Sequence, residues 1–326
     1  LEFRRVLFRS EGRATDAEKV LIAAGRYGNF ATLEYELASA RLAAGFYRDA
    51  ADGLAGMFVL KDGTIGTRLG GRVSREAATL SELIAPERRA SIFAPSAGDD
   101  AERDRQLAAL LQFTQQLNSS QPDETALAAA ADAFATGSDR MQVFRQLYAA
   151  SALLDKKAAL PKAVEIARAS VSGVETGVAS PYASSAAMAS ELYEARRSAL
   201  LRGEYINVPD VPRVTLSAVL RGRIEDIAGW ASYQMGKTDD AVLRLKRATG
   251  VLPVDSAWWR STMWRLGAAL AASGKDLEAL DAYIKSYKSS GPDAIRYSVI
   301  EALYKKVNGS DDGLTAKIGE IGRAHV

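Results

Sequence analysis

One short stretch has the residue types and spacing of a phosphate-binding loop. Residues 231–238 read ASYQMGKT, in which four residues separate a small residue from Gly-Lys-Thr. In such a loop a strand leads into glycine-rich backbone whose N–H groups hold phosphate, and a helix follows. Here the preceding residues have a helical pattern, and Ser232–Met235 contain no glycine. We therefore interpret Gly236, Lys237 and Thr238 as a turn between two helices.

Three other groups of residues could support chemistry, and each has a simpler interpretation. The four glycines of Lys61–Arg72 lack the strand-then-helix context of a phosphate loop, so we predict a loop or small hairpin. The acidic pairs at 239–240 and 311–312 precede helical patterns, which favours helix capping over metal binding. Charged side chains also cluster on one predicted helix, where spacings of three residues favour salt bridges; they are Glu191, Glu194, Arg196 and Arg197.

The composition excludes several classes of enzyme. The chain has no cysteine, and its one histidine is His325, near the C-terminal end. Zinc sites and catalysis by Cys–His or Ser–His–Asp groups need these residues. Acid–base chemistry by Asp, Glu, Lys or Tyr remains open, but no residue is singled out for it. We predict a noncatalytic protein without cofactor or metal.

Apolar residues recur every three or four positions along most of the chain, which predicts helices. In the first such helix Phe30, Leu33, Leu37, Ala40, Arg41 and Ala44 share one face, and Gly45 ends it. The further helices predicted in this way are Tyr47–Phe58, Asp99–Asn118, Pro122–Ala135, Gln142–Leu154, Leu160–Val171, Ser184–Leu201 and Thr215–Met235. Gly203–Arg213, with two prolines, predicts an extended connection. No apolar run approaches the length of a membrane span.

The two ends of the chain have a different origin in our interpretation. Codons can be chosen for Leu1–Ser10 and for Ile321–Val326 that reproduce the two strands of a common sequencing adapter. We expect these segments to be artefacts around a gene fragment of about residues 11–319, with the true N-terminus missing. Without their four arginines and one glutamate, 38 basic residues face 39 acidic ones. This balance argues against nucleic acid as a partner.

The C-terminal third contains an internal repeat. Gly229, Gly236, Ala241, Leu245 and Ala248 recur 38 positions later as Gly267, Gly274, Ala279, Tyr283 and Ser286, and Pro253 recurs as Pro292. This pattern resembles the tetratricopeptide repeat, whose period is 34 residues, with the extra residues in Val254–Arg260. A weaker third copy begins at Ile295–Val307. The resemblance implies an all-α fold, a right-handed α-solenoid of stacked antiparallel helix hairpins. We divide it into an irregular array over 11–213 and repeats over 214–319.

The resemblance also implies a binding face. All four tryptophans lie between Trp230 and Trp264, and the first helices of such repeats line a concave groove. The residues placed on that face are Arg223, Asp226, Trp230, Tyr233 and Trp264. Tryptophan, tyrosine and arginine are frequent binding hot spots, so we predict a peptide-binding site there. Alternatively, the rings only pack successive repeats together.

The sequence thus predicts a scaffold that binds a protein or peptide. In an alternative interpretation it is the accessory repeat arm of a larger bacterial envelope enzyme, because Ser298–Gly319 faintly resembles the end of repeat regions that continue into, for example, a thioredoxin-like domain. The alanine- and aspartate-rich composition favours a bacterial source. It leaves open the oligomeric state, and whether the compartment is the cytoplasm or the periplasm.

Overall fold

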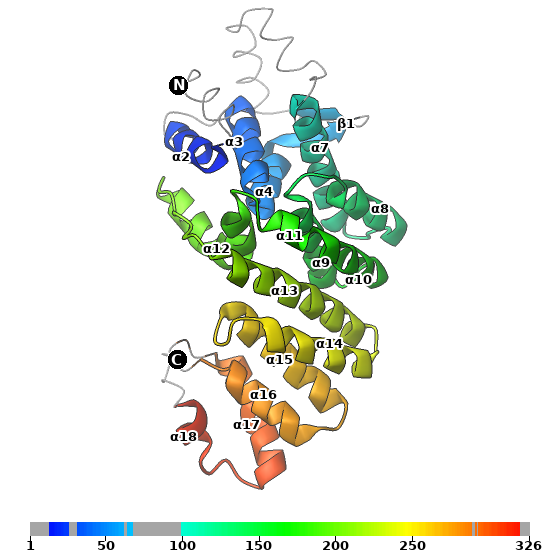
Figure 1. Cartoon of the computed structure of the whole chain (residues 1–326), viewed down its shortest axis with the longest axis vertical. Coiled ribbons are helices and arrows are strands. Elements are labelled where there is room, and N and C mark those ends of the chain that lie inside the picture. Colours follow the sequence, from blue (N-terminus) through cyan, green and yellow to red (C-terminus); the bar gives the residue numbers. More distant parts are fainter. Residues whose placement is uncertain are drawn as a thin grey trace, which may run out of the picture. The chain divides into compact units, whose positions relative to one another are not determined.

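The computed structural model describes residues 13–25, 31–61, 64–67, 99–288, 291 and 293–319. In this part of the chain the fold is an all-α solenoid, in which helices pack against their neighbours in sequence (Figure 1). None of the described helices is long and apolar enough to cross a membrane. The terminal segments 1–10 and 321–326 lie outside the described residues, as do Phe30 and Pro292.

The chain forms two compact units. The first contains residues up to Ala152 together with Glu175–Pro212, and the second contains Leu153–Val174 and the chain from Arg213 onward. The helices of the first unit are α2 (Ala14–Gly25), α3 (Ala31–Ala44), α4 (Tyr47–Met57), α7 (Asp99–Leu117), α8 (Glu124–Ala135), α9 (Gln142–Lys156, ending in the second unit), α11 (Val174–Gly177, beginning there) and α12 (Ala183–Leu201).

The glycine-rich stretch after α4 takes part in a small antiparallel hairpin. Strand β1 (Phe58–Lys61) pairs with β2 (Thr64–Thr67), and Lys61 lies opposite Thr64. The predicted loop or hairpin is confirmed to this extent, although β1 begins three residues before the glycine-rich segment. Residues 68–72 of that segment lie outside the described part of the chain.

An aromatic cluster forms part of the core of the first unit. Phe134 of α8 stacks on Phe113 of α7 at a ring-centroid distance of 6.4 Å and meets Tyr47 of α4 edge-on at 5.4 Å. Tyr148 of α9 lies 5.9 Å from Phe134. Rings at these distances and angles attract one another beyond their burial. They join α4 to three consecutive helices that lie far from it in the sequence.

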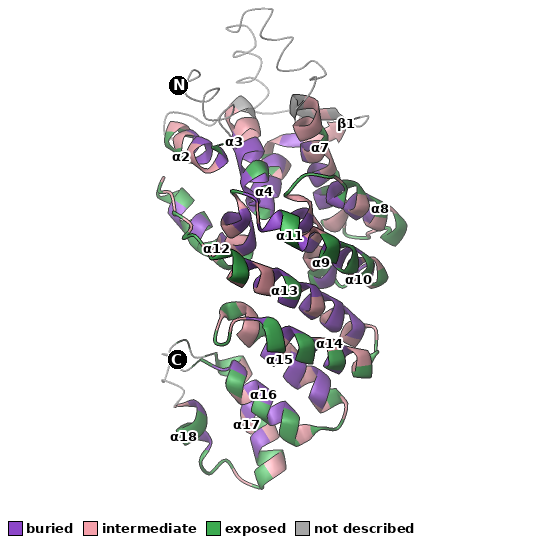
Figure 2. Cartoon of the chain, viewed as in Figure 1, coloured by how far each residue is buried: buried purple, intermediate pink, exposed green. Residues whose placement is uncertain are grey.

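The second unit is a succession of helix hairpins. Its elements are α10 (Leu160–Ala169), the short 3₁₀ helix η1 (Ser170–Gly173), α13 (Arg213–Gln234), α14 (Thr238–Val251), α15 (Ala257–Ala272), α16 (Asp276–Ser286), α17 (Ala294–Asn308) and α18 (Leu314–Ile318). From α13 to α17 each helix packs against the next, and α10 packs against α13. Figure 2 shows buried and exposed residues alternating along these helices, as amphipathic helices require.

Glycine turns separate the two helices of each hairpin. Gly236 and Gly274 have φ values of +75° and +73°, which residues with a Cβ adopt at a cost. Gly236 and Lys237 lie between α13 and α14, and Thr238 is the first residue of α14. The turn predicted for this stretch is confirmed. Asp240, in the first turn of α14, accepts hydrogen bonds from Ser232 and Arg244.

The repeated small residues lie where the helices of one hairpin cross. A Cβ added at Gly229 of α13 would lie 2.9 Å from Leu245 of α14, and one added at Gly267 of α15 would lie 2.6 Å from the Tyr283 ring of α16. Ala241 and Ala279 are fully buried at the same crossings. The glycines of the repeat thus allow the close approach of the two helices.

Several predicted helix ends differ by a few residues. The helix predicted from Pro122 begins at Glu124, because the Asp123 side chain caps it by accepting the N–H groups of Thr125 and Ala126. The helix predicted over Leu160–Val171 changes to 3₁₀ geometry after Ala169. The connection predicted before Arg213 is confirmed to the extent that residues 204–212 form neither helix nor strand.

Candidate functional site

The predicted binding residues lie in the second unit, beginning with an aromatic pair on α13. The rings of Trp230 and Tyr233 are nearly parallel, with centroids 4.6 Å apart and an interplanar angle of 9°. Residues three positions apart on a helix are neighbours on one face, which allows this stacking. Both side chains are half-buried, so part of the stacked pair stays accessible.

An arginine from the first helix of the next hairpin completes this group. Arg265 of α15 forms an ion pair with Asp226 of α13, and its guanidinium carbon lies 5.7 Å from the centroid of the Trp230 ring. A cation within about 6 Å of an indole face is attracted to it. The Arg265 side chain is 25% exposed and that of Asp226 is 12% exposed. The group therefore presents an arginine and a tryptophan, whereas the aspartate mainly positions the arginine.

A second group that contains a tryptophan, a tyrosine and an arginine lies on the following hairpin. Trp264 of α15 contacts Tyr283 of α16, with ring centroids 4.5 Å apart and inclined by 49°. Arg296 of α17 places its guanidinium carbon 5.1 Å from the Trp264 centroid. Burial raises the pKa of Tyr283 to about 12, so its phenol stays neutral at physiological pH. In both groups a tryptophan of one first helix meets an arginine of the next first helix.

The predicted residues are thus only partly brought together. Asp226, Trp230 and Tyr233 belong to the first group, Trp264 belongs to the second, and Arg223 is half-buried elsewhere on α13. Trp264 also packs against the buried cluster around Leu280 and Ile300, which agrees with the alternative that the rings join successive repeats. Peptide binding by these residues stays a prediction.

The sequence reasoning missed Arg265 and Arg296. A signal existed for both: Arg265 directly follows Trp264, and Arg296 lies on the helix of the third repeat copy. Together the two groups offer ring faces for apolar side chains and guanidinium N–H groups for carboxylates or carbonyls. Neither group contains a nucleophile activated by a neighbouring base, and the described residues contain no cluster of acidic or histidine ligands for a metal ion.

A different kind of site occurs in the first unit, where a network of buried charges joins several helices. Glu18 of α2 is fully buried and accepts hydrogen bonds from Arg41 of α3 at 3.0 Å and from Arg196 of α12 at 2.6 Å. Arg196 also pairs with Asp49 of α4 at 3.4 Å and lies over the Phe46 ring. Burial raises the pKa of Asp49, although Arg196 and Arg41 partly oppose this.

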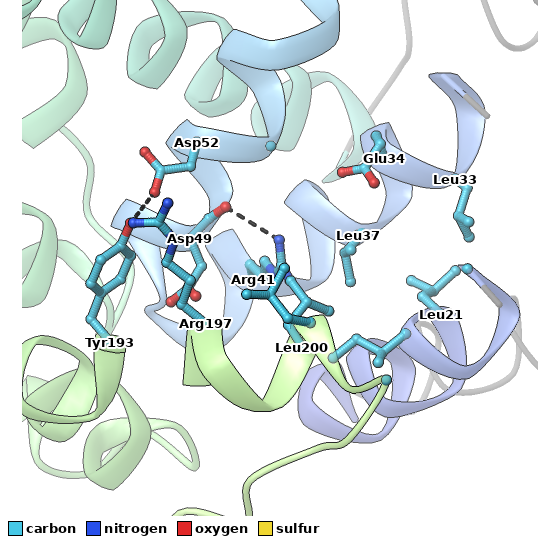
Figure 3. A pocket seen from close by; sticks show the side chains of 15 residues that line it. Leu21, Leu33, Glu34, Leu37, Arg41, Asp49, Asp52, Tyr193, Arg197 and Leu200 are labelled. Carbon is cyan, nitrogen blue, oxygen red and sulfur yellow. Dashed lines mark hydrogen bonds between the residues drawn. The ribbon is translucent and has the colours of Figure 1, made fainter. Parts of the chain in front are cut away.

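A cavity of about 520 Å³ lies beside this network (Figure 3). Its lining comes from α2, α3, α4 and α12, and includes Arg41 and Asp49 of the buried network. Leu21, Leu33 and Leu37 form an apolar part. Tyr193, which hydrogen-bonds Asp52, lies with Arg197 at the other side in Figure 3.

Within the charged cluster over residues 191–197, Arg196 pairs with residues of other helices and not with its own helix as predicted. The spacing predicts salt bridges within the helix for Arg196, but its ion pairs reach Glu18 and Asp49 on other helices. The reason is that Arg196 faces the core, where a guanidinium needs buried acceptors. A signal for the network was present in the sequence, since Arg41 occupies a position in the apolar stripe of its helix.

Comparison with protein-family models finds no match for this chain, and comparison with curated proteins finds none either. The helical-repeat architecture therefore stands on the structure itself. Any function has to be argued from the two sites described above.

Proposed function

We propose that this chain is a tetratricopeptide-like repeat protein of bacterial origin that binds a protein or peptide along the first helices of its C-terminal repeats. The observation that carries this proposal is the repeated tryptophan–arginine contact, Trp230 with Arg265 and Trp264 with Arg296. Each contact joins consecutive first helices, which in stacked hairpins form one continuous surface.

The chemistry of the two groups suits an extended peptide. A ring face and a guanidinium beside each other can take an apolar side chain and a carboxylate or carbonyl oxygen of the same ligand. The two groups lie on successive hairpins, although at positions that are not equivalent in the repeat, so a peptide bound along the first helices would meet a tryptophan–arginine pair twice. Half-buried aromatic residues lose little conformational freedom on binding, which favours them as anchors.

Peptide display tests this proposal with random sequences in place of a defined partner. We expect selection from a library of random peptides on the intact chain to yield peptides that bind it. These peptides should bind the Trp230→Ala and Arg296→Ala variants about tenfold or more weakly. Because Trp230 and Trp264 belong to the two groups, tryptophan fluorescence gives a direct readout of binding. Leu277→Ala is the matched control, since Leu277 is 73% exposed on a second helix.

Stability has to be measured on the same variants. Trp230 and Arg296 lie outside the buried clusters described in this unit, so their replacement should leave the helical circular dichroism and the melting temperature nearly unchanged. Trp264 packs on such a cluster, and its replacement by alanine should lower both affinity and stability. Peptides that bind all variants equally would contradict the proposal. If the double variant Trp230→Ala/Trp264→Ala loses its helical structure cooperatively, the two rings instead belong to the core.

A further inference from the structure

The cavity of the first unit has an apolar wall and a charged end. The wall is formed by aliphatic side chains of α2, α3 and α12, namely Leu21, Ile22, Leu33, Leu37, Leu200 and Leu201. Its volume of about 520 Å³ falls in the range of small-molecule sites. Small-molecule sites commonly combine such a wall with a few polar groups that fix the ligand's orientation.

Two opposite charges converge at one point of this cavity. A Cβ added at Gly53 of α4 would lie 3.2 Å from Oε2 of Glu34 and 3.7 Å from Nη1 of Arg41. Within the described part of the chain no hydrogen bond or ion pair joins this carboxylate to this guanidinium. Arg41 donates hydrogen bonds to Glu18 at 3.0 Å and to the backbone oxygen of Asp49 at 3.3 Å. Glu34 and Arg41 therefore lie close together against Gly53, as an acceptor and a donor that do not bond each other.

The electrostatics of Glu34 favour a cation beside it in the cavity. Burial raises the pKa of Glu34, and the attraction of Arg41 only partly opposes the effect. The ionised carboxylate therefore lacks a close compensating charge, which an ammonium group would supply. Arg41 offers a complementary position for an anion, and Arg197 provides a second guanidinium in the cavity lining.

We propose that this cavity binds an aliphatic α-amino acid as its zwitterion, with the ammonium group at Glu34, the carboxylate at Arg41 and the side chain against the leucine wall. The spacing favours this class, because Oε2 of Glu34 and Nη1 of Arg41 lie 3.2 and 3.7 Å from the same Cβ position on α4 and are therefore close to each other. A ligand that contacts both groups needs its two charges close together, as they are on a single α-carbon. A dipeptide or longer chain separates its terminal charges too far to satisfy both groups.

Calorimetric titration of the intact chain with L-leucine tests the proposal. We expect saturable binding of leucine. Leucinamide lacks the carboxylate, N-acetylleucine lacks the ammonium group and glycine lacks the side chain, so each should bind at least about tenfold more weakly. A tenfold difference in affinity corresponds to about 1.4 kcal/mol. If no leucine binding is detected at concentrations up to about 10 mM, the proposal is overturned, because even weak binding would be seen at that concentration. Affinities for leucinamide and N-acetylleucine equal to that for leucine would also overturn it, because the paired charges would then not be recognised.

Two glycines on one helix provide a matched pair of variants. Gly53→Ala places a methyl group 3.2 Å from Oε2 of Glu34 and so displaces this carboxylate, whereas Gly56→Ala meets no atom within 4 Å. Neither glycine has a positive φ, so alanine suits the helix at both positions. We expect Gly53→Ala to abolish leucine binding and Gly56→Ala to retain it. Wild-type binding by Gly53→Ala would overturn the proposal.

Glu34→Gln keeps the test decisive if Gly53→Ala is poorly folded. This change removes a half-buried charge and retains the shape of the side chain, so the fold should persist. We expect it to weaken leucine at least about tenfold while leaving the already weak binding of N-acetylleucine unchanged, because that ligand has no ammonium group. Equal leucine affinity of Glu34→Gln and the wild type would contradict the assigned role of Glu34.

Discussion

At the scale of single residues, burial decides which charged side chains affect the stability of the fold. Glu18, Arg41 and Arg196 are nearly inaccessible, and each finds its partner on another helix. The second oxygen of Glu18, Oε2, has no hydrogen-bond partner among the described residues. Such a network is sensitive to the loss of one member, since a charge left alone in the interior has little water to stabilise it.

Arg196→Ala should therefore destabilise the first unit severely. The change leaves Asp49 and Glu18 with fewer cationic partners and also removes the contact with the Phe46 ring. We expect the free energy of unfolding to fall by about 3 kcal/mol, the usual cost of breaking a buried ion pair. Chemical denaturation, monitored by circular dichroism, measures this change.

Arg202→Ala is the control for that experiment. Arg202 pairs with Glu204 at 2.9 Å, but the two side chains are 59% and 55% exposed. Exposed pairs contribute about 0–1 kcal/mol, so this variant should unfold almost as the wild type does. Similar losses in both variants would show that burial does not set the importance of these arginines.

At the scale of elements, the hairpins of the second unit depend on close helix crossings. Gly267 lets α15 approach the Tyr283 ring of α16, and Gly229 lets α13 approach Leu245 of α14. A side chain at either glycine would force the two helices apart or displace a buried residue. Glycine is poor for helix formation in itself, so its presence here reflects packing.

Gly267→Ala should therefore destabilise the second unit even though alanine is the better helix former. The new methyl group would lie 2.6 Å from the Tyr283 ring, and overpacking of this kind costs about 1–3 kcal/mol. Gly250→Ala in α14 meets no atom within 4 Å and should raise stability by about 0.5–1 kcal/mol. Thermal melts compare the two, and a stabilised Gly267→Ala would show that the crossing tolerates a side chain.

At the scale of the whole molecule, charge is nearly balanced. The chain has 42 basic and 40 acidic residues, and ion pairs on helix surfaces such as Lys246 with Glu278 and Lys306 with Asp276 bring the two signs together. Binding to nucleic acid relies on unneutralised positive charge that displaces counterions from phosphate. The chain provides little of it.

We accordingly expect no specific or tight nonspecific association with nucleic acid. A fluorescently labelled DNA duplex should show no change in anisotropy with the intact chain at about 150 mM salt, the physiological ionic strength. A cationic protein of similar size serves as the positive control. Binding that weakens steeply as salt is added would contradict this prediction, because that dependence is the signature of phosphate contacts.

The sequence by itself determined most of the helices, the glycine turns and the helical-repeat architecture, although α2 was not predicted. Apolar periodicity and glycine at the turns act locally, so they can be interpreted without reference to distant residues, and Gly236 shows this clearly. Helix ends were less certain, since capping by Asp123 or a change to 3₁₀ geometry after Ala169 depends on local contacts.

Only the tertiary structure decided which distant residues meet. Arg265 reaches Trp230 across 35 positions, and Arg196 reaches Glu18 across 178, pairings that no local pattern encodes. Glu34 and Arg41 share one face of α3, but only the packing of α4 brings Gly53 against them. These contacts depend on the packing of whole helices against one another, and packing is fixed by the shape of the complete core.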